Sequence, residues 1–154
     1  MILGGKQIAV SFILIILLQT GIVSQTRCSN ADAEKADYEA SRARTWDKLY
    51  HSYLHYSGCD DGSIGEGYSD SVVRLLAYHW DTLPQAFPLF AGDAGFHKFA
   101  LKHIDSTTKY KDLKMVRAKA IHSCPTGGNE YCVQIRKAAE TALRENGVVF
   151  PPMK

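Results

Sequence analysis

The stretch "GCDDGSIGEGYSDSVV", residues 58–73, begins with a cysteine, carboxylates and glycines and then becomes apolar. Ser63 and Glu66 fit the S-x-x-E capping box, in which each side chain bonds a free backbone N–H at the start of a helix. Asp60 and Asp61 come just before, where the positive end of a helix favours carboxylates. The stretch therefore predicts the first turn of a helix with acidic residues around it.

Apolar residues recur at helical spacing on both sides of this stretch. No glycine or proline interrupts residues 31–57, which favours one long helix there with a left-handed exit at Gly58. Two prolines divide residues 81–93 into a turn and one short helical piece, and "PTGGN" at 125–129 separates the last two helices. Only "VVF" near the end suggests a strand. We therefore expect an all-α bundle or orthogonal array of about five helices, over residues 31–57, 63–80, 94–104, 113–124 and 130–146. Asp93 would cap the third of these helices, and Asn146-Gly147 would form the exit from the last.

The first 24 residues have the pattern of a secretory leader. Lys6 supplies a positive start, and residues 8–18 are nearly all apolar, which is too short for a membrane span of roughly twenty residues. We predict a signal peptide over residues 1–24 that is cleaved so that the mature chain begins near Gln25. An uncleaved anchor over residues 8–23 is the alternative.

Cleavage would leave about 130 residues, the length of one ordinary domain, so we expect a single helical domain over residues 25–154. Lysine and arginine nearly balance aspartate and glutamate in this part of the chain. Such a balance predicts neither nucleic acid nor a membrane surface as a partner.

Four cysteines in an exported chain predict disulfides, and four cysteines allow three pairings. Cys124 and Cys132 lie at core-facing positions on either side of a tight turn, so we expect them to be bonded. A continuous helix over 31–57 would be roughly 40 Å long, whereas bridged Cα atoms lie within about 7 Å. A bond between Cys28 and Cys59 is therefore excluded unless that helix is broken.

The acidic residues of the opening stretch have two possible roles. Capping explains Asp60 and Asp61, and Asp70 with Arg74 forms an i,i+4 ion pair. The alternative is a candidate interaction or acidic site, with a cation or a substrate held by the carboxylates beside Tyr68. The spacing fails the EF-hand pattern, because the positions that should hold the third and fifth ligands are Gly62 and Ile64. We therefore favour capping and surface pairing, and predict no metal and no cofactor here.

Gly65 and Gly67 are not explained by capping, because a glycine inside a helix costs about 1 kcal/mol relative to alanine. We expect another backbone, that of the first helix, to approach the helix closely at these positions. A ligand or partner lying against the bare first turn is the second interpretation.

The histidines give weaker signals. His51 and His55 stand one helical turn apart and could chelate zinc or copper, but no third ligand can be named and the H-E-x-x-H pattern is absent. In "HIDST", His103 reads as a residue at a helix end and Asp105 as the start of a turn. No serine lies in a G-x-S-x-G motif, so we predict no catalytic residue.

The strings "CDDGSIGEGYSDSVVRLLA", "KHIDST", "SCP" and "YC" together resemble a recurring pattern in small exported bacterial proteins with no assigned activity. The resemblance covers most of residues 59–135 and includes three of the four cysteines. It implies a helical exported domain and carries no catalytic residue over to this chain. Immunity proteins that plug the active site of a toxin have a similar size and class, which is an analogy at the level of the fold.

These observations favour a periplasmic or secreted, non-enzymatic protein-binding module, with an inhibitor or immunity-like protein as one form of it. We expect the partner to be another protein of the cell envelope, with no nucleic acid and no stable membrane insertion after cleavage. Aromatic residues dominate protein interfaces, although packing in the core would explain the same residues. The aromatic candidates for the binding surface are Trp46, Tyr50, Tyr53, Tyr56, Tyr68 and Trp80.

The main alternative is an envelope hydrolase that acts on glycan or peptidoglycan. Glu66 would be its acid, and Asp60, Asp61 or Asp70 would be the partner carboxylate. A metal-binding periplasmic protein is the second alternative.

Overall fold

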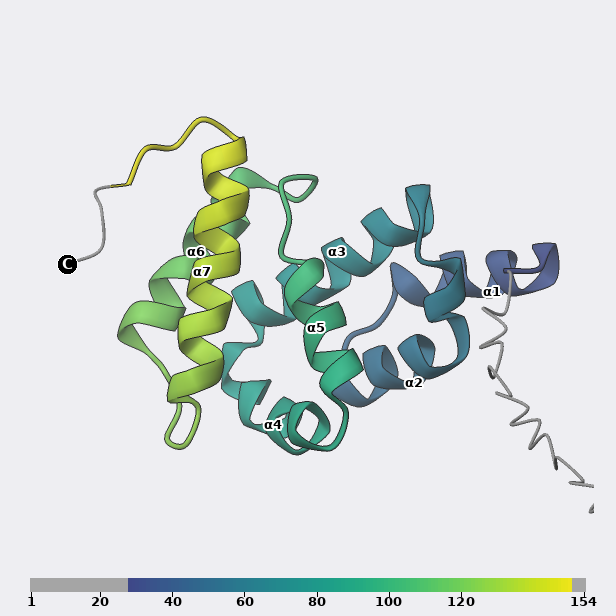
Figure 1. The fold of residues 1–154 in the computed structure, drawn as a ribbon, viewed down its shortest axis with the longest axis horizontal. Coiled ribbons are helices and arrows are strands. Elements are labelled where there is room, and N and C mark those ends of the chain that lie inside the picture. Colours follow the sequence, from purple (N-terminus) through teal and green to yellow (C-terminus); the bar gives the residue numbers. More distant parts are fainter. Residues whose placement is uncertain (1–27, 151–154) are drawn as a thin grey trace, which may run out of the picture.

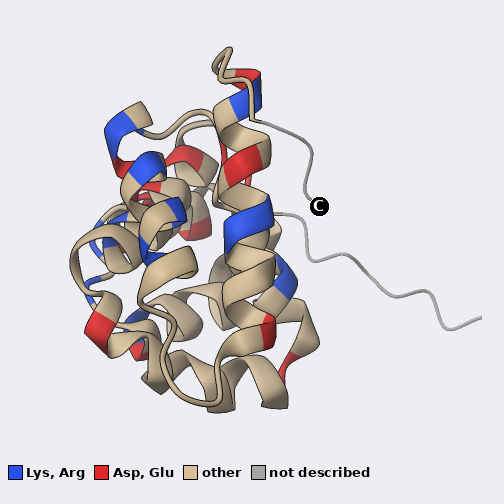
Figure 2. Cartoon of the chain, turned by 90° about the vertical axis from the view of Figure 1, so that its left-hand side faces the viewer, with Lys and Arg blue, Asp and Glu red and all other residues tan. Residues whose placement is uncertain are grey.

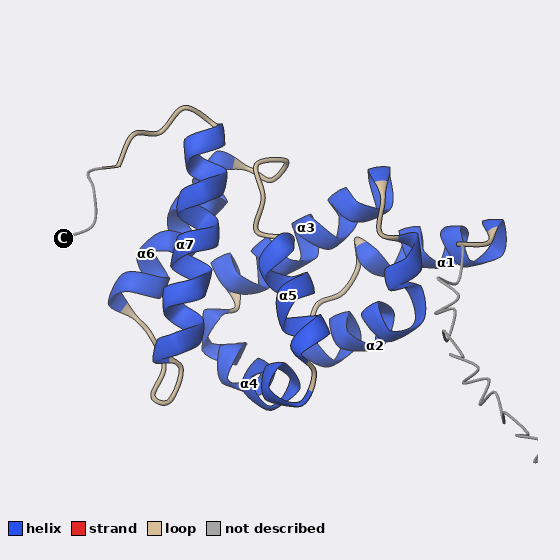
Figure 3. Ribbon diagram, viewed as in Figure 1, coloured by secondary structure: helices blue, strands red, loops and turns tan. Residues whose placement is uncertain are grey.

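The computed structural model describes residues 28–150, so the predicted signal peptide lies outside the described residues. This part of the chain is helical throughout, with no strand (Figure 3), which confirms the all-α prediction. It contains more helices than the five that were expected, because the predicted helix over 31–57 is divided into two and residues 83–92 form a further helix. The α-helices are α1 Asn30–Ala40, α2 Trp46–Tyr56, α3 Gly62–Tyr78, α4 Leu83–Gly92, α5 Ala94–Lys102, α6 Tyr110–His122 and α7 Asn129–Glu145.

The helix predicted over residues 31–57 is broken between α1 and α2, so that prediction was wrong. Side chains of α3 form hydrogen bonds with the backbone carbonyl groups at the end of α1. The Ser71 hydroxyl donates to the Ala40 oxygen, and the Arg74 guanidinium donates to the Ser41 oxygen. The Thr45 side chain accepts from a backbone N–H in the first turn of α2 and caps it. These partners replace the helical hydrogen bonds that the turn gives up.

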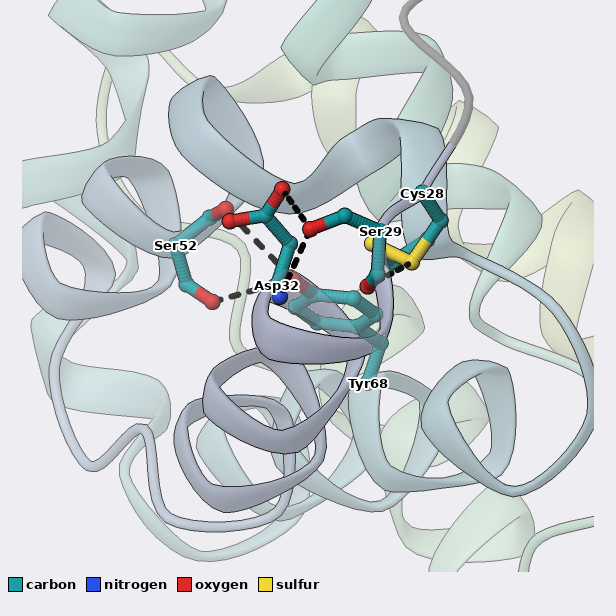
Figure 4. Close-up of a disulfide and its surroundings, with 6 residues drawn as sticks. Cys28, Ser29, Asp32, Ser52 and Tyr68 are labelled. Atoms are coloured by element: carbon teal, nitrogen blue, oxygen red, sulfur yellow. Dashed lines mark hydrogen bonds between the residues drawn. A yellow bond between two sulfur atoms is a disulfide. The ribbon is translucent and has the colours of Figure 1, made fainter.

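The break permits a disulfide between Cys28 and Cys59, whose Cα atoms are 4.8 Å apart. The exclusion of this bond depended on an unbroken helix over residues 31–57, and it does not apply because that helix is broken. Cys28 lies just before α1, and Cys59 closes a short 3-10 turn, Ser57–Cys59, that follows α2. Gly58 lies inside this turn and is not the left-handed exit that was predicted. Figure 4 shows the disulfide beside the start of α1, where the Ser29 side chain caps the helix.

Helix α3 begins one residue before the predicted start and is capped by a different residue. Asp61, and not Ser63, is the N-cap, and its carboxylate accepts the backbone N–H of Gly62. Gly62 has a φ of +50°, a conformation that favours glycine. The predicted capping box is therefore wrong, because Ser63 already lies inside the helix.

The segment with two prolines forms the predicted turn and short helical piece, as a 3-10 turn over Trp80–Thr82 followed by α4. Pro84 lies in the first turn of α4, where a missing N–H leaves no helical bond unmade, and Pro88 lies inside the helix with an exposed side chain. Asp93 then ends α4 and caps α5 through the backbone N–H of Phe96, as predicted.

Helices α6 and α7 lie side by side at one end of the molecule (Figure 1). The predicted disulfide between Cys124 and Cys132 joins them across their connecting turn. An ion pair between Arg117 and Glu140, with a nitrogen–oxygen distance of 2.9 Å, joins the same two helices. Gly147, at φ +85°, forms the predicted exit from α7.

Helix α3 runs between the α1–α2 end of the molecule and the α6–α7 end (Figure 1), and the core forms around it. Trp46, Tyr68 and Trp80 are buried in this core, and Tyr50 and Tyr53 are half-buried against it. Core packing therefore explains most of the aromatic residues that the sequence suggested as a binding surface. No helix in residues 28–150 is long and apolar enough to cross a membrane.

Gly67 lies where α3 meets the end of α1. A Cβ at this position would be 3.2 Å from the backbone nitrogen of Ser41 and 3.3 Å from the Cβ of Ala40. The predicted close approach of the first helix is thus confirmed at Gly67. The missing side chain allows α1 to reach the hydrogen-bonding groups of α3.

We expect Gly67→Ala to lower the free energy of unfolding by about 1 kcal/mol, because overpacking against a backbone outweighs the gain in helix propensity. Gly92→Ala is the matched control, since a Cβ there would meet nothing within 4 Å. We expect the control to be neutral or slightly stabilising. Urea unfolding with the disulfides intact measures both, and a Gly67→Ala protein as stable as the control would contradict the packing argument.

Candidate functional site

The candidate acidic site is divided among separate structural roles. Asp61 caps α3, and Asp70 pairs with Arg74 at 2.5 Å on the surface, as predicted. Glu66 is exposed. Tyr68 is fully buried, its hydroxyl 2.9 Å from the Ser52 hydroxyl (Figure 4), and burial raises its pKa to about 12. Asp60, Asp61 and Glu66 nevertheless line one surface pocket of about 250 Å³ together with His103 and Asp105, whereas Tyr68 and Asp70 do not line it.

Asp60 does not serve backbone amides, so its predicted role was wrong. Its Oδ2 atom accepts from the Lys102 ammonium at 2.7 Å and lies 3.1 Å from the His103 Nε2 atom. The Asp60 side chain is 9% exposed, and the His103 side chain is 2% exposed. Asp60 therefore ties the segment before α3 to the end of α5.

Gly65 is explained by the same carboxylate. A Cβ on Gly65 would lie 3.2 Å from the Asp60 Oδ1 atom, so the glycine makes room for a side chain and not for the backbone that was predicted. Oδ1 is buried without a hydrogen-bond partner among the residues that the structure describes. Its position against Gly65 keeps the other oxygen turned toward Lys102 and His103.

Ser69 and Asp105 complete this polar cluster on the other side of the imidazole. The Ser69 Oγ atom is 2.9 Å from His103 Nδ1, 2.5 Å from Asp105 Oδ2 and 3.1 Å from the Gly65 carbonyl oxygen. Ser69 has a single proton, and the short contact with Asp105 is satisfied when the hydroxyl donates there. A carboxylate can only accept, so the His103 Nε2 atom donates to Asp60.

Ser69, His103 and Asp60 have the residue types of a hydrolase triad, but their arrangement does not suit catalysis. Ser69 is 1% exposed, so a substrate cannot reach its oxygen. Asp105 competes for the proton that a general base would have to remove. The cluster therefore acts as a polar clamp between the start of α3 and the end of α5.

Only part of this clamp could be predicted from the sequence. The interpretation of "HIDST" is confirmed in part, since His103 caps α5 and Asp105 accepts the Thr107 backbone N–H in a turn. The partners Asp60 and Ser69 were not connected to it, because they lie more than thirty residues away along the chain. The available clue in the sequence was a serine, Ser69, one helical turn after a glycine, Gly65.

A groove between the end of α1 and the start of α2 is a separate feature of the surface. Its volume is about 450 Å³, and it is lined by Tyr38, Glu39, Arg42, Ala43, Lys48 and His51. The Arg42 guanidinium lies 4.3 Å from the centre of the Tyr38 ring, at cation–π distance. Tyr38 is 62% exposed, so the stacked pair faces solvent beside the groove.

His51 and His55 both lie on the exposed side of α2, and their rings stack with centroids 4.2 Å apart. Within residues 28–150, no group of three or more His, Cys, Asp or Glu side chains is placed to hold a metal ion. The sequence could not name a third ligand for this pair, and the described residues add none of these types.

The chain matches no family model, no curated protein and no solved structure. The geometry of its own residues is therefore the basis for a proposed function.

The clamp predicts how Asp60 contributes to stability. We expect Asp60→Asn to lower the free energy of unfolding by about 2 kcal/mol at pH 7, because His103 loses a charged acceptor in a buried position. Asp70→Asn is the control, since it breaks only a surface pair, and should cost less than about 0.5 kcal/mol. If the two variants lower the free energy of unfolding equally in urea, the clamp contributes no more to stability than a surface ion pair does.

The effect of Asp60 should also depend on pH. Burial raises the pKa of this carboxyl, but hydrogen bonds and charge from His103 and Lys102 outweigh burial and lower it. A lowered pKa in the folded state stabilises the protein above the unfolded-state value of about 4, and the contribution is lost as the pH falls through the folded value. The stability difference between wild type and Asp60→Asn should therefore shrink below about pH 4. A difference that stays constant down to pH 2 would contradict this assignment.

Proposed function

We propose that this protein is an exported, non-enzymatic protein-binding module, and that the groove between α1 and α2 receives an acidic segment of another envelope protein. The observation that carries the proposal is the stacked pair of Arg42 and Tyr38 on the rim of that groove. Arginine and tyrosine are enriched among the residues that contribute most to protein interfaces. An inhibitory, immunity-like role is one form that such binding would take.

The arrangement of the side chains on the rim of the groove supports binding. Arg42 already lies over Tyr38 in the free protein, so less side-chain freedom remains to be lost when a partner docks. Leu54 is 55% exposed and lies three residues after His51 on α2, which extends the surface with an apolar side chain. A partner segment could therefore place an apolar or aromatic side chain beside its charges.

The charge of the groove supports an acidic partner. Arg42 and Lys48 are cationic, His51 can carry a proton, and Glu39 is the single carboxylate in the lining. Complementary charge raises association rates and favours the matching partner over others. On the side of the molecule formed by α6 and α7, in contrast, both signs of charge are mixed (Figure 2).

Within residues 28–150, the carboxylates that the sequence suggested as partners for a catalytic acid are held by other groups, which supports a non-enzymatic role. The proposed hydrolase would need Glu66 and a second carboxylate free to act, yet Asp60, Asp61 and Asp70 are engaged by Lys102, the Gly62 amide and Arg74. The two disulfides fit an oxidising compartment outside the cytoplasm. Periplasmic or secreted localisation also rests on the predicted signal peptide and on the resemblance to small exported bacterial proteins.

We expect Arg42→Glu and Tyr38→Ala each to weaken binding of an acidic partner by about 2 kcal/mol, because an interface anchor is lost. The probe is a synthetic peptide that combines glutamates with one aromatic residue, titrated at low and high salt, alongside capture from envelope extracts. Binding should weaken with salt.

Tyr110→Ala is the matched control, because Tyr110 is an exposed ring under a Lys114 ammonium and lies outside the groove. If the peptide does not bind, or if the captured envelope proteins are the same for wild type, Arg42→Glu and Tyr110→Ala, the groove is not the binding surface.

A further inference from the structure

The exposed side of α2 presents two neighbouring imidazole rings. His51 and His55 are four residues apart, and their rings are 29° from parallel with centroids 4.2 Å apart. Residues at this spacing are neighbours on one side of a helix. The lone pair of an imidazole nitrogen lies in the plane of its ring, so one of the two exposed rings has to turn out of the stack before both nitrogens face one ion.

A backbone hydrogen bond determines the tautomer of His55. Its Nδ1 atom is 2.8 Å from the carbonyl oxygen of His51. A carbonyl can only accept, so Nδ1 carries the proton, and the neutral ring has its free electron pair on Nε2. Histidines that bind metals characteristically donate the other ring N–H to a carbonyl or carboxylate in this way. His55 is thus already in the form that binds a metal ion.

The neighbouring residues leave the site open to solvent. Asp47 lies one helical turn before His51 on the same side of α2. Its negative charge offsets the positive charge of the neighbouring Lys48. Because no group of three His, Cys, Asp or Glu side chains is placed for a metal among the described residues, water would fill the remaining coordination positions. In such a site two nitrogens bind the ion, and water or other small ligands exchange at the remaining positions.

We propose that His51 and His55 form a bidentate site for a transition-metal ion that prefers imidazole. Imidazole suits Cu²⁺, Zn²⁺ and Ni²⁺, whereas Mg²⁺ and Ca²⁺ prefer oxygen ligands. Affinity follows the usual order of divalent ions, so Cu²⁺ binds most tightly. The site shares His51 with the lining of the proposed docking groove, whereas His55 lies outside that lining and belongs to the metal site alone.

Calorimetric titration of the tag-free protein with CuCl₂, ZnCl₂ and MgCl₂ tests the site. We expect one equivalent of Cu²⁺ to bind more tightly than Zn²⁺, with no binding of Mg²⁺. Binding should weaken as the pH is lowered, because protons compete for the ring nitrogens. Electron paramagnetic resonance of the Cu²⁺ complex should show nitrogen ligands.

His51→Ala and His55→Ala should each weaken Cu²⁺ binding about tenfold or more, because each removes one arm of the chelate. His79→Ala and His122→Ala are matched controls, since both residues are exposed and lie on other parts of the chain. Cu²⁺ affinity that is the same in the double variant His51→Ala/His55→Ala as in wild type would overturn the proposal. His55→Ala should bind the acidic peptide as wild type does, because docking does not depend on His55. This measurement separates a loss of metal binding from a loss of docking.

Discussion

The end of α1 is held by hydrogen bonds that come from α3 and not from the next turn of the same helix. The Ser71 hydroxyl bonds the Ala40 carbonyl, and the Arg74 guanidinium bonds the Ser41 carbonyl. These bonds let the chain turn at a point where its own residues would continue a helix. The turn brings Cys28 to Cys59, and the missing side chain at Gly67 lets α1 approach closely enough for the bonds to form.

The proposed binding surface is a consequence of the same turn. If residues 31–57 formed one straight helix, Tyr38 and His51 would lie far apart along it and no groove would separate them. Because the chain turns, the end of α1 and the start of α2 enclose the groove that Arg42 and Lys48 line. The rigid α2 also presents the imidazole pair of His51 and His55 to solvent.

The polar clamp at the start of α3 shows how a set of catalytic residue types can serve structure. His103 lies between Asp60 and Ser69, and the serine is directed to Asp105. Every member is held by hydrogen bonds inside the molecule, so little is left to bind or activate a substrate. Buried polar groups of this kind are stable when other polar groups pair with them, which explains why Asp60 and Ser69 lie on either side of His103.

The sequence by itself determined the all-α class, the helices α5, α6 and α7, the Asp93 cap and the Cys124–Cys132 disulfide, because each depends on residues close together in the chain. The close approach at Gly67 was also predictable, since a helical glycine needs a compensating contact. Tertiary structure alone decided the break after Ala40, and with it the groove. It also decided the partners of Asp60. In both cases the deciding hydrogen bonds join residues more than thirty positions apart, and local spacing carries no information about such pairs.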